Sequence, residues 1–185
     1  RGLRFVQEFF LVACSIADLV RRFRADHDDW AGLADQAAVQ LNDTHPALAV
    51  PELLRVLLDE AHLEWDEAWE ITKSVLAYTN HTLLPEAMEK WPLRFFKVII
   101  PRHLELIQEI NRRFLIQVQA QYPGDEARCR RMALIERRGS RRVRMAHLAM
   151  LGCHSVNGVS QLHSQLLRDR VVSDFAELFP DRFNN

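Results

Sequence analysis

Two short apolar runs in this chain end abruptly in small polar residues, and this pattern constrains the fold more than any other feature. The run 37–41 is followed by the letters NDTHP, and the run around 77–78 by TNHT. A third polar cluster occupies 154–158. Pro46 suits the first turn of a helix, because its missing NH group would have no partner there. The order of strand, turn and helix start predicts an α/β fold with parallel strands.

Helical periodicity accounts for most of the remaining chain. Apolar residues recur at helical spacing from Leu3 to Phe23. Gly139 and Ser140 are placed to turn a small hairpin within 134–144. Further helices are predicted over 46–62, 66–76, 101–122, 126–133 and 159–167. We therefore expect a helix-rich α/β fold with a few short, mostly parallel strands.

Composition and charge exclude several classes of function. The 185 residues are 48% apolar and 26% charged, which is typical of a globular protein. Twenty-four basic and 25 acidic residues give a net charge of −1, so no global field attracts nucleic acid or an anionic membrane. The arginine-rich segment 128–144 is interspersed with acids such as Glu136 and lacks stacking aromatics, which favours a solvated face. Apolar stretches are short and interrupted by charge. We predict neither a nucleic-acid nor a membrane partner.

The cysteines and histidines predict no metal or redox site. Cys14, Cys129 and Cys153 are odd in number and widely spaced, which favours free thiols in a reducing cytoplasm. Eight histidines include no HExxH motif and no zinc-finger spacing. Cys153 and His154 would point to opposite faces of a strand, so we expect a buried structural cysteine and not a nucleophilic pair.

The polar clusters suit recognition of hydroxyl groups. Open parallel sheets bind ligands beyond the carboxyl ends of their strands, and Asn, Asp, Thr and His offer donors and acceptors at short reach. The alternative is that these residues only cap helices and turn the chain. A single cluster does not decide between this structural role and the recognition of hydroxyl groups. Trp65 and Trp69 are expected to pack in the core or between helices and not to stack on a sugar. The positions of the acidic residues indicate no pair of carboxylates of the kind that a glycosidase uses. The sequence also contains no phosphate-binding loop motif.

Several uncommon strings carry a resemblance to a known family. They are Gln40-Leu41-Asn42-Asp43-Thr44-His45-Pro46, Ala77-Tyr78-Thr79-Asn80-His81-Thr82, Leu84-Pro85-Glu86-Ala87, Pro101-Arg102-His103 and Val156-Asn157-Gly158-Val159. In this order, and in one register from about Leu3 to the last residues, they resemble the α-glucan phosphorylases. That family includes the glycogen, starch and maltodextrin phosphorylases.

The resemblance implies an enzyme that cleaves terminal α-1,4 glucosyl units with inorganic phosphate and releases glucose 1-phosphate. It also implies a two-domain, GT-B-like glycosyltransferase fold with pyridoxal phosphate bound as a Schiff base. The chain resembles the later part of the N-terminal domain, so 1–185 is expected to be a single partial domain without the C-terminal cofactor domain. Lys73, Lys90 and Lys97 lie in no motif that resembles the cofactor-binding one. Pyridoxal phosphate is therefore expected in the full-length parent and not in this chain, which alone should not catalyse phosphorolysis.

The same resemblance assigns substrate-binding roles and no catalytic residue. His81 would hydrogen-bond the 6-hydroxyl of the bound glucosyl unit, and Asp43 and His45 would line the cleft toward the acceptor sugars. Asn157 and Gly158 would bring backbone close to the sugar, where a bulky side chain at the glycine would obstruct it. The cleft wall would be shaped by three further residues, Thr82, Ala87 and Val159.

The same resemblance implies binding partners for the whole protein, and two alternative functions remain. The parent is expected to bind α-1,4-glucan and phosphate in the cytoplasm. In a partial domain the face of the first helix with Val6, Phe10 and Phe23, and the face of the 101–122 helix, would lack covering partners, so a dimer or larger homo-oligomer is expected. Two rival functions stay open, a stand-alone glucan-binding module and a non-catalytic structural or interaction domain.

Overall fold

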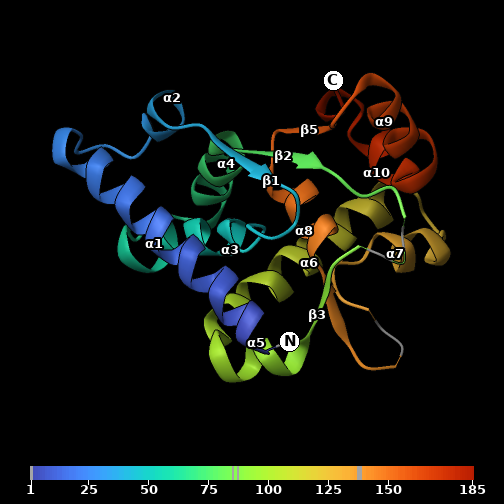
Figure 1. The fold of residues 1–185 in the computed structure, drawn as a ribbon, viewed down its shortest axis with the longest axis horizontal. Coiled ribbons are helices and arrows are strands. Elements are labelled where there is room, and N and C mark those ends of the chain that lie inside the picture. Colours follow the sequence, from blue (N-terminus) through green and yellow to red (C-terminus); the bar gives the residue numbers. More distant parts are fainter. Residues whose placement is uncertain (1, 85, 87, 137–138) are drawn as a thin grey trace.

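A computed structural model describes residues 2–84, 86, 88–136 and 139–185, and it shows two small sheets among many helices (Figure 1). The larger sheet is parallel, with strand order β1(Val39–Asn42), β2(Leu76–Asn80) and β5(Ser155–Gly158). The smaller sheet pairs β3(Lys90–Pro92) with β4(Arg142–Arg144) in antiparallel fashion. The predicted helix-rich α/β fold with mostly parallel strands is confirmed.

Each helix predicted from the sequence is present to within a few residues, and four further helices in the described part of the chain were not predicted. They are α1(Gly2–Asp26), α2(Leu33–Gln36), α3(Ala49–Arg55), α4(Trp65–Val75), α5(Leu93–Ile99), α6(Pro101–Gln121), α7(Glu126–Met132), α8(Met145–Gly152), α9(Gln161–Leu166) and α10(Ser173–Leu178). Single π-helical stretches, Val56–Glu60 and Leu167–Val171, extend α3 and α9, and a 3₁₀ turn covers Pro180–Arg182.

Local signals explain where several helices begin. Pro101 occupies the first turn of α6, where a missing NH group costs nothing. The Asp125 side chain caps α7 by accepting from the Arg128 NH at 2.8 Å, and Ser160 caps α9 by accepting from the His163 NH at 3.2 Å. These boundaries depend on neighbours in sequence, which is why helical periodicity predicted α6, α7 and α9 to within a few residues.

The core lies around the central strand β2. Leu76, Tyr78 and Asn80 are buried on one face of the strand, while Ala77 and Thr79 are partly exposed on the other. Helices α4 and α8 pack against β2, and every residue of α8 except His147 is buried. Cys153, directly after α8, is fully buried as predicted, and this burial raises the pKa of its thiol.

Helix α1 lies along one side of the molecule, opposite α9 and α10 in the view of Figure 1. Val6 and Phe10 are exposed as expected, but Phe23 and the α6 face are buried, which corrects that part of the expectation. The reason is that other parts of this chain cover them; Phe23, for example, stacks on His27 with ring centroids 4.5 Å apart. The buried stripe of α1 contains Phe5, Glu8, Val12, Ile16 and Phe23.

The predicted hairpin within 134–144 is only partly present. Ile135 and Val143 form one antiparallel bridge, and Gly139 has a φ of +69° that suits a turn. The main partner of β4 is β3, about fifty residues earlier, with Trp91 opposite Val143. A sequence pattern without long-range information favours the local partner, so this pairing was missed.

The arginine-rich segment is engaged in ion pairs. Arg128 is mostly buried and contacts Asp174 and Glu177, while Arg142 binds Glu136 at 2.8 Å. The expectation of a simple solvated face is therefore wrong for Arg128. Acidic partners at these distances reduce the local positive field that a polyanion would need.

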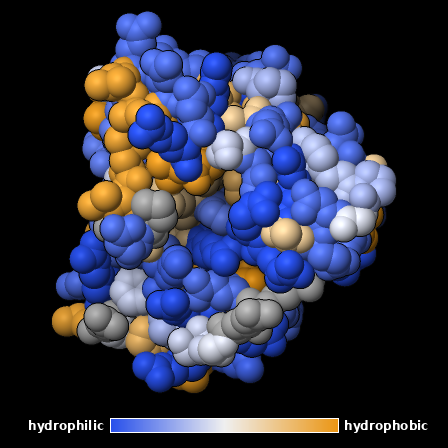
Figure 2. Space-filling model, turned by 90° about the vertical axis from the view of Figure 1, so that its right-hand side faces the viewer, coloured by the Kyte–Doolittle hydropathy of each residue, from blue (hydrophilic) through white to orange (hydrophobic). Residues whose placement is uncertain are grey.

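The surface combines a polar face with a few exposed apolar side chains. The face drawn in Figure 2 is largely hydrophilic, with hydrophobic residues gathered mainly toward one edge. The most exposed large apolar residues include Leu3, Phe10 and Leu11 on α1 and Val98 on α5. Among the described residues, no helix has the length and apolar character that crossing a membrane requires.

Candidate functional site

The carboxyl ends of the three parallel strands carry a connected row of polar side chains. Asn42, Thr79 and Asn157 occupy one register across the sheet. The Gln40 amide donates to the Thr79 hydroxyl at 2.8 Å, and that hydroxyl donates to the Asn157 amide oxygen at 2.9 Å. Because parallel strands end at the same edge, two of the predicted polar clusters and the end of the third meet here. His154, by contrast, lies at the amino end of β5.

His81 follows β2 and is exposed at this edge. Its Nε2 lies 2.5 Å from the Asn42 amide oxygen. Since an amide oxygen only accepts, Nε2 carries the proton in this arrangement. The other ring nitrogen, Nδ1, is then an acceptor for a ligand hydroxyl.

Asp43 shapes the turn after β1. Its φ of +69° lies in the left-handed region, which Asp tolerates better than most residues. The Asp43 NH extends the sheet by donating to the Thr79 carbonyl at 2.9 Å, and its carboxylate accepts from the Thr44 NH at 2.7 Å. These bonds turn the chain sharply and direct His45 away from the sheet.

A cavity of about 460 Å³ opens beside this turn and brings together three of the predicted site residues, Asp43, His45 and Thr82. Buried Asn80 also lines it, as do Arg4, Glu89 and Trp91 from other elements. Asn157 lines a separate cavity of about 290 Å³ near the chain terminus, and Val159 is 54% exposed. The predicted residue Ala87 lies outside the described residues.

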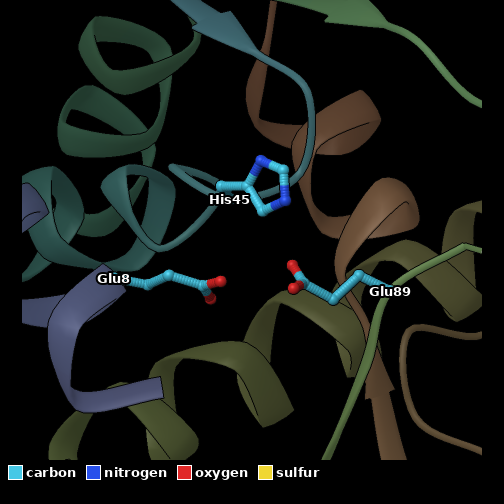
Figure 3. A group of neighbouring side chains, drawn as sticks. All are labelled: Glu8, His45 and Glu89. Atoms are coloured by element: carbon cyan, nitrogen blue, oxygen red, sulfur yellow. The ribbon is translucent and has the colours of Figure 1, made fainter. Parts of the chain in front are cut away.

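Three acid and imidazole groups converge beside the 460 Å³ cavity, which His45 and Glu89 line (Figure 3). Glu8 comes from α1, His45 from the turn after β1, and Glu89 from the segment before β3, with one ligand atom of each within 4.8 Å of the others. Sequence reasoning missed Glu8 and Glu89 because they are far apart in the chain. One available signal was that Glu8 interrupts the apolar stripe between Phe5 and Val12.

The carboxyl groups in this cluster are unusually placed. Glu8 is 9% exposed, and its two oxygens accept from Arg4 Nε at 3.1 Å and Trp91 Nε1 at 3.2 Å. Burial, followed by the nearby Glu89 charge, raises the pKa of Glu8 to about 7. The Oε2 atom of Glu89 is buried and has no hydrogen-bond partner among the described residues.

Gly158 has a structural reason to be glycine. A Cβ atom there would lie 2.4 Å from Cδ2 of His163 and 2.8 Å from the backbone nitrogen of Ser164. The prediction that the backbone at Gly158 comes close to the sugar stays a prediction. The observed neighbour is α9, which packs against the end of β5.

Two of the three lysines are engaged in ion pairs. Lys73 pairs with Glu70 at 2.6 Å, and Lys90 pairs with Glu136 at 3.0 Å. Lys97 is exposed on α5. A Schiff base needs a lysine amine that is free to react, and the ion pairs of Lys73 and Lys90 do not fit that requirement.

The aromatic pair on α4 packs as expected. Trp65 and Trp69 are half-buried against the core, and the Arg113 guanidinium lies 4.7 Å from the centre of the Trp65 ring. Both line a cavity of about 370 Å³ on the side of α6.

Comparison with known proteins agrees with these features. The family model described as "Carbohydrate phosphorylase" matches residues 1–185, so the chain belongs to the carbohydrate phosphorylase family. It is 48% identical over 193 residues to the muscle form of glycogen phosphorylase from Ovis aries, and 49% identical to the brain form from Bos taurus. It is 50% identical over 185 residues to glycogen phosphorylase from Synechocystis. The resemblance to α-glucan phosphorylases is confirmed. These matches cover all of the chain but only 22–23% of each relative's length.

Proposed function

We propose that this chain forms part of the sugar-binding wall of an α-glucan phosphorylase. The whole protein, a glycosyltransferase, would release glucose 1-phosphate from α-1,4-glucans with inorganic phosphate. The observation that carries the proposal is the family match along the entire chain, at 48–50% identity to glycogen phosphorylases. In this proposal residues 1–185 are a partial domain of a two-domain, GT-B-like fold.

The carboxyl edge of the parallel sheet is the proposed contact with the glucosyl unit. His81 would accept a hydrogen bond from the 6-hydroxyl through Nδ1, because Nε2 already donates to Asn42. Asp43, His45 and Thr82 would face the acceptor sugars from the 460 Å³ cavity. The rest of the wall would be Ala87, Asn157, Gly158 and Val159.

Pyridoxal phosphate is proposed for the whole enzyme, where its phosphate group would supply proton transfer. The lysines of this chain do not fit it, so other parts of the enzyme would hold the cofactor. This chain would bind and orient the sugar, and alone it would be inactive. Its three free thiols suit a reducing, cytoplasmic setting.

The test is the kinetics of His81→Ala in the enzyme that contains this chain. Loss of a hydrogen bond to a reacting sugar should lower kcat/KM for glycogen phosphorolysis by about tenfold or more. The matched control is His154→Ala, which removes an exposed histidine at the other end of the sheet. Equal kcat/KM for His81→Ala and wild type would refute the assigned role. Glucan binding without phosphorolysis would favour a glucan-binding module instead.

A further inference from the structure

A fully buried amide lies directly behind the proposed sugar contacts. Asn80, the last residue of β2, has no exposed surface. Its Oδ1 atom accepts from the Thr82 NH at 2.9 Å and from His163 Nε2 at 3.1 Å, while its Nδ2 donates to the Tyr78 hydroxyl at 2.9 Å. One side chain therefore joins the turn after β2, the core of the sheet and helix α9. Among these bonds, the one to the Thr82 NH fixes the backbone immediately after His81.

His163 supplies the second donor to this amide from a separate element. It lies in the first turn of α9, is 9% exposed, and its own NH group is capped by Ser160. Because Asn80 Oδ1 is an acceptor, the neutral ring must carry its proton on Nε2. Burial, and then the nearby His81 ring, lowers the pKa of His163, which favours that neutral form.

Gly158 leaves the space that the His163 ring occupies. In the sheet register Gly158 lies opposite Asn80, and a Cβ atom at Gly158 would lie 2.4 Å from the ring. The Gly158 NH also donates to the Ser164 hydroxyl at 2.9 Å, which holds α9 against the strand end. The glycine, the imidazole and the amide thus form one continuous contact from α9 to the turn at 80–82.

We propose that His163 is a positioning residue for sugar recognition and acts through Asn80 on the turn that carries His81 and Thr82. The inference rests on the function proposed above. His163 itself does not contact the sugar. Without its donor, one of the two hydrogen bonds that orient the Asn80 oxygen is lost, and the acceptor of the Thr82 NH is held less firmly. His81 would then form a weaker hydrogen bond with the 6-hydroxyl. Only a sugar that carries this hydroxyl would be affected.

The test measures how well the enzyme that contains this chain distinguishes glucose 1-phosphate from its 6-deoxy analogue in glucan synthesis. His163→Phe keeps a ring and removes the donor, whereas His163→Gln retains an amide donor. We expect His163→Phe to reduce the ratio of the two kcat/KM values by about tenfold, with the 6-deoxy substrate nearly unaffected. His163→Gln should recover much of that ratio. His154→Phe, the matched control, should leave it unchanged.

The outcomes separate this inference from the function on which it rests. If His81→Ala lowers the ratio and His163→Phe does not, the positioning role is overturned while the proposed role of His81 stands. If wild type and His81→Ala show the same ratio, the proposed role of His81 fails and the positioning role fails with it. A uniform loss with both substrates indicates a purely structural role for His163 and also overturns the inference.

A second measurement needs no variant. Hydrogen exchange in the wild-type enzyme should show the Thr82 amide protected, although it lies next to exposed His81. Rapid exchange of that amide would contradict the inference, even if His163→Phe failed to fold.

Discussion

At the scale of single residues, Glu8 is the most unusual group in the protein. An acid on the apolar stripe of α1 is nine-tenths buried, receives two hydrogen bonds and lies close to a second carboxyl group, Glu89. Burial disfavours its charged form more than Arg4 and Trp91 favour it, so its pKa rises from 4.5 to about 7. The folded protein therefore holds a proton there that the unfolded chain releases at lower pH.

This difference makes stability depend on pH in a defined direction. The stabilisation from protonated Glu8 is fully present below pH 4.5 and is lost as the pH rises through about 7. Between pH 5 and pH 8, the free energy of unfolding of wild type should fall relative to that of Glu8→Gln by up to about 3 kcal/mol. Urea denaturation at several pH values measures this. Glu67→Gln on the exposed surface of α4 is the control. If the free energy of unfolding of Glu8→Gln changed with pH in parallel with that of wild type, the raised pKa of Glu8 would be contradicted.

Gly158 gives a second prediction at this scale. Gly158→Ala would place a methyl group against the His163 ring and the Ser164 backbone, and the resulting overpacking should cost about 1–3 kcal/mol of unfolding free energy. Gly32→Ala is a matched control, because a Cβ atom there would meet nothing within 4 Å and its φ is −79°. Thermal denaturation compares the two. Equal melting temperatures would show that α9 moves away without cost.

At the scale of elements, a buried ionic network joins α3 to α6. Glu52 is 4% exposed and contacts His103 at 2.5 Å and Arg55 at 2.9 Å. Burial alone would raise the pKa of Glu52, but the hydrogen bonds from His103 and Arg55 outweigh it and the pKa is lowered. Helix α3 directly follows the turn with Asp43 and His45, so this network fixes one support of the candidate site.

Removing the shared acid should therefore be costly. Glu52→Gln removes the acidic partner of buried His103 and one of the two acidic partners of Arg55, and it should lower the free energy of unfolding by about 3 kcal/mol. Glu105→Gln, which breaks an exposed pair with Arg102 on α6, should change it by less than about 1 kcal/mol. Chemical denaturation measures both. A similar small effect for the two variants would mean that the buried network contributes no net stability.

Helices and strands were predictable from the sequence where residues close in the chain determine their boundaries. Pro101 and the spacing of Ile107, Ile110 and Phe114 predicted α6, and the polar residues after 37–41 predicted the end of a strand. The pairing of β4 with β3 was not predictable, because Trp91 and Val143 are brought together only by the tertiary fold. The candidate site divides in the same way. Asp43, His45 and Thr82 came from sequence strings, whereas Glu8, Glu89 and His163 depend on contacts between distant segments.

At the scale of the whole molecule, the exposed apolar residues of α1 predict self-association. Leu3, Phe10 and Leu11 are each more than 60% exposed on one helix, and hiding them from water is favourable. Light scattering of the 185-residue chain over a tenfold concentration range should show a mass above 21.6 kDa that falls for Phe10→Ser. The matched control is Val98→Ser on α5. A monomeric mass at every concentration would contradict the prediction.

The central claim is that the carboxyl edge of the parallel sheet binds a glucosyl unit through His81. A crystal structure of the enzyme that contains this chain, with a bound maltooligosaccharide, tests it most directly. We predict a sugar hydroxyl within hydrogen-bond distance of His81 Nδ1, with neighbouring sugar density in the cavity lined by Asp43, His45 and Thr82. Sugar bound only elsewhere, with the edge of the sheet empty at saturating ligand, would contradict the account.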